Sequence, residues 1–340
     1  MINDDSSAAA AVSNAGDAGA PQSAARPSVA EALIDAFAAC GTRRMFGLPG
    51  GGSSLDLIEA ARRRGIDFVL ARHECAAVMM AAATAELDGS LGVALTTKGP
   101  GTANATNGVA HAALDRCPVA VVTDGFSPQQ LAYVSHQWFD QRALFAPLVK
   151  AHSTLAGAGT GTELEQLAAA AFAPRRGPVH VELTGPDARA EAGGLASAAQ
   201  LSAIRAGAPG AAGVDPGAAP EQTASGGPEL ERAAAMLAAA RRPVLVLGLE
   251  SRDEALAQAV RQLVDALGCA VLVTYKAKGV VADGSPQYVG IFTGGSAERA
   301  AVERSDLIVL VGLDPVELIL QPWPYRVPVL EIGWVPHPVH

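Results

Sequence analysis

Glu74 is the residue of this sequence best suited to proton chemistry. It lies in the segment 72–77 (Arg-His-Glu-Cys-Ala-Ala), directly after an apolar run and at the start of a small-residue helix. A carboxylate at such a junction is poorly solvated, and it can hold a proton for a bound heterocycle. The competing interpretation is structural, because the helix dipole stabilises an acidic side chain in the first turn of a helix.

Two glycine-rich turns accompany Glu74. Residues 97–104 read Thr-Lys-Gly-Pro-Gly-Thr-Ala-Asn, and residues 49–52 read Pro-Gly-Gly-Gly. Glycine lets the backbone approach a ligand closely. The spacing of the 97–104 segment after Glu74 favours a ligand-binding role for the carboxylate over the structural interpretation.

Alternating strands and helices must position these residues. The alternation predicts an α/β fold with two domains, each a mostly parallel sheet flanked by helices, at 28–185 and 228–340. Segments of Ala, Ser, Gly and Pro predict a disordered tail at 1–27 and a flexible linker at 186–227. The expected strands are 45–48, 66–71, 91–96, 119–123, 179–183, 243–247, 270–274, 306–311 and 327–332. The expected helices are 28–40, 54–63, 74–87, 103–114, 163–172, 229–240, 253–267 and 296–304.

Composition and charge exclude several classes of protein. The formal net charge of −9 argues against a nucleic-acid surface. The four cysteines are scattered and form no zinc or disulfide pattern. No uninterrupted apolar stretch reaches the roughly 18 residues of a membrane span, and no signal peptide is recognisable at the N-terminus. We expect a cytoplasmic protein without a membrane partner.

The segments around Glu74 and Gly99 resemble the pyrimidine-binding domain of thiamine-diphosphate enzymes of the acetolactate synthase class. That pattern reads H-E-x-A-A, then a helix and a strand, then T-S-G-P-G-x-x-N. The resemblance implies that Glu74 hydrogen-bonds the aminopyrimidine ring and activates the cofactor. It also implies cofactor contacts from Pro49, Gly50, Gly51, Glu74, Thr97, Pro100 and Asn104. Residues 274–279 and 288–290 resemble landmarks of the same family's middle domain.

Further site residues follow from the same resemblance. Gln137 corresponds to a glutamine near the reacting carbon, where it would orient intermediates. His136 departs from the family pattern, and it is either a proton donor or a surface histidine. Lys98, Asp124 and Lys150 have no assigned role at this point; Lys98 either points inward, where it would hold a substrate carboxylate, or outward into solvent.

The family's diphosphate-binding pattern does not occur in these 340 residues. That pattern is Gly-Asp-Gly followed by a later asparagine, whose oxygens bind Mg²⁺. Here no Gly-Asp-Gly occurs, and the last asparagine is Asn107. The resemblance therefore implies a split enzyme: a second subunit would bind the diphosphate and Mg²⁺, and this chain would supply no metal ligand. We expect self-association through the pyrimidine domain in an α2β2 assembly.

The implied reaction is decarboxylation of a 2-oxo acid, acyloin-type carboligation, or both, with thiamine diphosphate as cofactor. FAD is not predicted, because residues 248–251 (Gly-Leu-Glu-Ser) match no phosphate-binding loop. The alternative is a non-catalytic scaffold or remnant subunit that keeps the fold for assembly with a partner.

Overall fold

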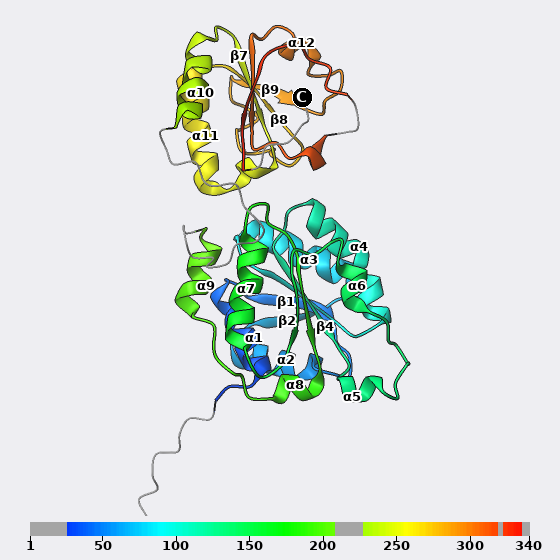
Figure 1. The fold of residues 1–340 in the computed structure, drawn as a ribbon. Coiled ribbons are helices and arrows are strands. Elements are labelled where there is room, and N and C mark those ends of the chain that lie inside the picture. Colours follow the sequence, from blue (N-terminus) through cyan, green and yellow to red (C-terminus); the bar gives the residue numbers. More distant parts are fainter. Residues whose placement is uncertain (1–25, 208–226, 319–321, 335–340) are drawn as a thin grey trace, which may run out of the picture.

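The computed structural model describes residues 26–207, 227–318 and 322–334. These residues form two α/β domains, each with a parallel sheet flanked by helices (Figure 1). The predicted fold class is thereby confirmed. Of the expected disordered tail, residues 1–25 lie outside the described residues. Its last two are held in place, since Arg26 pairs with Glu191 and the carbonyl of Pro27 accepts from Ala192.

The strands described in the first domain form a six-stranded sheet in the order β2-β1-β3-β4-β6-β5, and each neighbouring pair is parallel. β3 and β4 are buried along their whole length, which suits the apolar runs of strands covered on both faces. Because the strands are parallel, the turns after β1, β3 and β4 meet at one edge. The strands are β1 (Arg44–Leu48), β2 (Asp67–Leu70), β3 (Gly92–Thr96), β4 (Val119–Asp124), β5 (His152–Leu155) and β6 (Val179–Leu183).

Helices cover both faces of this sheet and create two apolar cores, one on each face. The first face is covered by α1 (Val29–Ala39), α2 (Ser54–Arg63), α7 (Thr160–Phe172), α8 (Gly185–Arg189) and α9 (Ala198–Arg205). The second face is covered by α3 (Glu74–Asp88), α4 (Pro100–Leu114) and α6 (Gln141–Phe145), and the short α5 (Pro128–Leu131) follows β4. A capping box formed by Ser28 and Glu31 begins α1.

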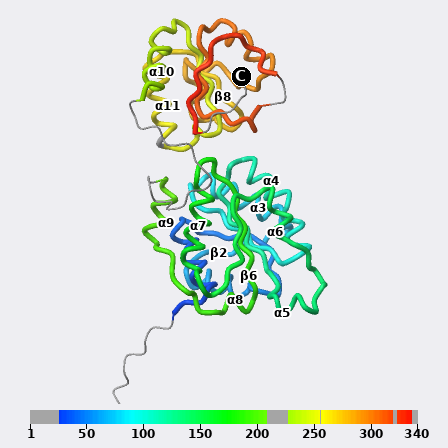
Figure 2. The backbone as a smooth tube through the Cα atoms, in the orientation of Figure 1, coloured from blue at the N-terminus to red at the C-terminus, as the bar shows by residue number. Residues whose placement is uncertain are grey.

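The expectation of a flexible linker over 186–227 is wrong for its first part. α9 lies in this stretch and packs beside α1 and α7 (Figure 2). Leu201 and Ile204 of α9 are buried in the core, and they are the apolar anchors of an otherwise small and polar helix. Tertiary packing therefore stabilises a helix that shows almost no periodicity in the sequence. Residues 208–226 lie outside the described residues.

In residues 227–318 and 322–334 the strands form a second parallel sheet in the order β11-β10-β7-β8-β9. Its elements are α10 (Pro228–Ala239), β7 (Pro243–Leu247), η1 (Leu249–Arg252), α11 (Glu254–Leu267), β8 (Ala270–Val273), β9 (Tyr288–Ile291), α12 (Arg299–Val302), β10 (Leu307–Val311), η2 (Pro315–Glu317) and β11 (Val329–Ile332). Throughout the described chain, no helix has both the length and the apolar character needed to cross a bilayer.

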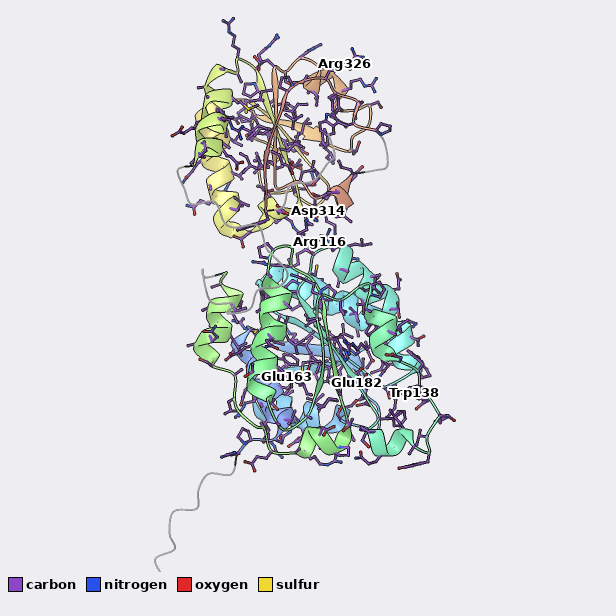
Figure 3. The ribbon with its side chains drawn as sticks, viewed as in Figure 1. Arg116, Trp138, Glu163, Glu182, Asp314 and Arg326 are labelled. Carbon is purple, nitrogen blue, oxygen red and sulfur yellow. The ribbon has the colours of Figure 1, made fainter. Side chains whose placement is uncertain are left out.

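Opposite edges of the two sheets meet where the domains contact each other. Arg116 follows α4, at the edge where the first sheet's strands begin, and it donates to both carboxylate oxygens of Asp314 at 2.8 and 3.0 Å. Asp314 follows β10, at the edge where the second sheet's strands end (Figure 3). The strand ends of the first sheet consequently point away from the second domain, beside α2, α5 and α8 (Figure 1).

Candidate functional site

Glu74 begins α3, at the edge where the strands of the first sheet end. Its side chain is buried, with 8% of the residue exposed. Asn104 of α4 donates from Nδ2 to Glu74 Oε2 at 3.1 Å. The structure thus brings together two of the sequence-predicted site residues from neighbouring helices. An amide donor of this kind fixes a carboxylate in one orientation.

Gly101 presents no side chain to the other carboxylate oxygen. A Cβ atom at this position would lie 3.3 Å from Glu74 Oε1 and 2.8 Å from Thr97 Cγ2. Pro100 is the first residue of α4, so the helix begins three residues earlier than the sequence predicted. The turn 99–101 therefore presents backbone rather than side chains to the carboxylate, as a pocket for a flat ring requires.

The turn at Pro49–Gly52 packs against the same region. A Cβ on Gly50 would lie 2.1 Å from Thr97 Oγ1 and 2.4 Å from Asp124 Oδ2, whereas a Cβ on Gly51 would meet nothing within 4 Å. The close packing of the turn therefore requires glycine at position 50, whereas Gly51 faces open space. The two glycine-rich turns predicted from the sequence are neighbours in the structure.

Asp124, Ser53 and Gln141 form a buried polar group that the sequence analysis did not assign to the site. Asp124 ends β4 and is fully buried, and its Oδ1 accepts from Ser53 Oγ at 2.7 Å. Gln141 Nε2 donates to the backbone carbonyl of Asp124 at 3.0 Å. A polar residue at the end of a buried parallel strand is the sequence signal that points to such a group.

His136 and Gln137 lie in the loop after α5, and both residues are exposed. Gln137 adopts a left-handed backbone conformation with φ of 59°. Its carbonyl oxygen would lie 2.1 Å from a Cβ on Gly99, so only glycine fits at position 99. The structure therefore places the backbone of Gln137, rather than its side chain, against the 99–101 turn.

Three further charged residues, Lys98, Lys150 and Glu182, lie in different parts of the first domain. Lys98 is half-buried, and its Nζ lies 4.9 Å from the ring centre of Phe126, a cation–π contact. Lys150 lies at the opposite edge of the sheet, where it donates to the carbonyl of Ala173 at 2.8 Å. Glu182, near the end of β6, is half-buried. Burial raises the pKa of Glu182, and a hydrogen bond from Gln141 offsets part of this effect.

Together these residues offer a buried acid, an amide that orients it and glycine-rich turns beside it. A group of this kind can exchange a proton with a nitrogen heterocycle. The sequence matches the N-terminal TPP binding domain of thiamine pyrophosphate enzymes over residues 27–144, and the central domain of the same enzymes over residues 230–328. The chain belongs to the thiamine pyrophosphate enzyme family.

Acetolactate synthases are among its relatives. The chain is 28% identical to the acetolactate synthase of Bacillus subtilis over 302 residues, which cover 85% of this chain and 48% of that protein. It is 30% identical to the large subunit of acetolactate synthase isozyme 2 of Escherichia coli over 289 residues, 83% of this chain and 49% of that subunit. The chain thus spans about half the length of these relatives. A shorter region of 159 residues is 37% identical to the isozyme 3 large subunit of Escherichia coli.

Proposed function

We propose that this chain is the pyrimidine-binding subunit of a two-component thiamine-diphosphate enzyme. The enzyme acts on a 2-oxo acid by decarboxylation, by acyloin-type carboligation, or by both. The observation that carries the proposal is the Glu74 carboxylate, which is buried, oriented by Asn104 and free of any side chain from Gly101. The similarity to acetolactate synthases supports the same reaction class.

The residues present fit the pyrimidine end of the cofactor. Gly51 faces open space, and Gly101 places no side chain against the Glu74 carboxylate, so a flat ring would meet backbone from both turns. Glu74 would exchange a proton with a ring nitrogen, while Asn104 holds the carboxylate in place. Thiamine diphosphate, when bound, supplies the carbanion chemistry. Pro49, Thr97 and Pro100 would shape the walls of the pocket.

His136 and Gln137 would act on the substrate side of the site. Both are exposed next to the 99–101 turn, so a bound substrate would shield them from solvent. The Gln137 amide would donate to an intermediate's oxygen, and the His136 imidazole would donate a proton to the bound substrate. Neither role requires the side chain to be buried before substrate binds.

We further propose that a partner subunit completes the site by binding the diphosphate and Mg²⁺. The candidate site faces away from the second domain, so the described residues of that domain do not reach it. Tyr133 and Trp138 are exposed aromatic residues in the loop between α5 and α6, which also carries Gln137; Figure 3 labels Trp138. Such side chains are enriched in protein interfaces. An α2β2 assembly in the cytoplasm is the arrangement we propose.

The test is to co-purify the full chain with its partner and to titrate the complex with thiamine diphosphate and Mg²⁺, using pyruvate as the substrate probe. We expect the wild-type complex to bind the cofactor, and Glu74→Gln to lower turnover by about 10²–10⁴-fold. Glu229→Gln is the matched control, because Glu229 occupies the first turn of α10 as Glu74 does in α3. Unchanged turnover in Glu74→Gln would remove Glu74 from the mechanism, and a wild-type complex without cofactor affinity would refute the proposed function.

A further inference from the structure

Asp124 is a buried carboxylate that neither the family pattern nor the proposed proton chemistry accounts for. Its residue is 0% exposed. Removing a carboxylate from water is costly unless hydrogen bonds compensate. Here Oδ1 accepts from Ser53 Oγ at 2.7 Å, Ser54 N at 3.1 Å and Ser54 Oγ at 3.1 Å, and Oδ2 accepts from Thr97 Oγ1 at 3.4 Å. Donors from two turns of the site thus converge on one side chain.

The first turn is fastened to Asp124 through the start of α2. Ser53 precedes α2, and its side chain makes no capping hydrogen bond within that helix. Instead, Asp124 at the end of β4 accepts hydrogen bonds from Ser53 Oγ and from the backbone N–H of Ser54, the first residue of α2. The helix dipole favours a negative group at this position. Ser54 Oγ also accepts from Gly50 N at 3.0 Å, which extends the link into the 49–52 turn.

Steric contacts make this link tight. A Cβ on Gly50 would lie 2.4 Å from Asp124 Oδ2, and a Cβ on Gly52 would lie 2.8 Å from Asp124 Cγ. Real side chains do not tolerate such separations, so the backbone of the turn rests directly on the carboxyl group. The position of the turn consequently depends on the position of Asp124.

The second turn is fastened to the same residue through Gln141. Gln141 Nε2 donates to the backbone carbonyl of Asp124 at 3.0 Å, and its Oε1 accepts from Gly99 N at 3.2 Å and from Thr102 Oγ1. Thr97, two residues before Gly99, donates to the Asp124 side chain. Both glycine-rich turns therefore have the end of β4 as their common attachment.

We propose that Asp124 is a positioning residue that sets the separation of the two glycine-rich turns, and with it the width of the slot for the aminopyrimidine ring. This inference rests on the proposed function for the identity of the ligand. Asp124 does not need to touch the ring. Its carboxylate acts through Ser53 and Ser54 on one side and through Thr97 on the other, and its backbone carbonyl holds Gln141.

The first test needs no partner and no cofactor. Amide hydrogen exchange of the full chain, followed by mass spectrometry, reports the opening of each turn separately. Asp124→Ala is expected to speed exchange at least tenfold in both 50–54 and 97–102. Asp124→Asn keeps an acceptor for the serine donors and is expected to restore protection to within about threefold of wild type. Wild-type exchange at 97–102 in Asp124→Ala would overturn the proposal.

Asp314→Ala is the matched control, because Asp314 is an equally buried, multiply hydrogen-bonded aspartate after a strand of the other sheet. It should lower the melting temperature and leave exchange in both turns unchanged. If Asp124→Ala does not fold, Ser54→Ala cuts the same link at Gly50 and is expected to speed exchange at 50–52. Unchanged exchange there contradicts the proposal.

The second test measures the dissociation constant for thiamine diphosphate with the co-purified complex. We expect Asp124→Ala to raise it at least tenfold, Asp124→Asn to raise it less than threefold, and Asp314→Ala to leave it unchanged. A wild-type complex that binds the cofactor, together with an equal affinity in Asp124→Ala, sinks the positioning role alone. A wild-type complex that does not bind it refutes the proposed function, and the exchange experiment then still decides whether Asp124 couples the turns.

Discussion

In both parallel sheets all strands end at one edge, but the residues that lie at these two edges differ. In the first sheet they carry Glu74, Asp124 and two glycine-rich turns, and they face away from the second domain. In the second sheet they carry Asp314 and Glu317, whose oxygens are occupied by donors from the protein. One edge is therefore arranged to receive a ligand, and the other is arranged to contact a neighbouring domain.

Hydrogen bonding explains this difference. Arg116 reaches Asp314 from the first domain with two donors, and the N–H of Val316 adds a third. Burial raises the pKa of Asp314, but the hydrogen bonds from Arg116 and Val316 outweigh it and hold the pKa below its ordinary value. Close backbone contact also fills the space between β7 and β10, since a Cβ on Gly248 would lie 2.3 Å from Leu313 Cα. Polar residues at strand ends therefore indicate a ligand-binding site only where part of the polar group is not occupied by donors or backbone of the protein itself.

Removing Arg116 should have the largest effect on stability. Arg116→Ala leaves the Asp314 carboxylate buried without its forked partner, which costs about 3 kcal/mol of unfolding free energy, at the lower end for broken buried pairs because Arg175 remains 3.6 Å away. Urea unfolding measures this loss, with the exposed Arg304→Ala as control. A loss of unfolding free energy below 1 kcal/mol would show that the contact between the two domains does not depend on the Arg116–Asp314 ion pair.

Alanine substitutions at the adjacent residues Gly50 and Gly51 test how tightly the turn after β1 is packed. Gly50→Ala forces a Cβ against Thr97 and Asp124, and we expect it to lower the unfolding free energy by about 1–3 kcal/mol. Gly51→Ala meets nothing and should leave the stability of the free chain unchanged. Melting temperatures of the two variants, measured side by side, test the packing; equal values would contradict it.

Acid should weaken the first sheet through buried His180, which contacts the half-buried His152. His180 Nδ1 lies 2.9 Å from His152 Nδ1 and its Nε2 lies 2.9 Å from Thr123 Oγ1. Burial and the neighbouring His152 lower the pKa of His180 to about 3. The unfolded chain, with a histidine pKa of about 6.5, takes up a proton that the folded chain refuses, so stability falls as the pH drops from about 6.5 towards 3.

His180→Gln removes the group at which the unfolded chain binds this additional proton. The unfolding free energy of the variant should depend less on pH, by roughly 1.4 kcal/mol per pH unit near pH 5. Urea unfolding at several pH values between 4 and 7 measures the slope. A slope equal to that of the wild type would mean that His180 is protonated inside the folded protein.

The smallest effect is expected at the partly exposed pair between the domains. Lys276 Nζ contacts Asp115, and both side chains retain some exposure to solvent. Lys276→Ala should cost about 0.2–1 kcal/mol, and high salt should abolish the difference from wild type. A loss as large as that of Arg116→Ala would show that burial does not decide which pairs hold the domains together.

Most of the fold could be predicted because most strands of this chain are buried apolar runs. β7 matches its predicted range of 243–247, and β3, β4, β6, β8 and β10 differ by one residue or less at each end. β5 and β9 were missed for local reasons. β5 is a short edge strand with polar residues, and β9 contains Gly290, so neither shows an apolar run.

The candidate site could be predicted only where its residues are close in sequence. Glu74 lies at the start of α3 as expected, and Asn104 follows it after one helix and one strand. Asp124 reaches Ser53 across 71 residues and Gln141 reaches Gly99 across 42. Spacing along the chain contains no information about such contacts, which arise only when parallel strands bring their ends to one edge.

A structure of the complex of this chain with its partner, loaded with thiamine diphosphate and Mg²⁺, tests the central claim most directly. We predict a Glu74 carboxylate oxygen within about 2.6–3.2 Å of a nitrogen of the aminopyrimidine ring, with the ring between the 49–52 and 99–101 turns. A ring bound elsewhere, or a Glu74 side chain that contacts Asn104 and no atom of the cofactor, would contradict the account.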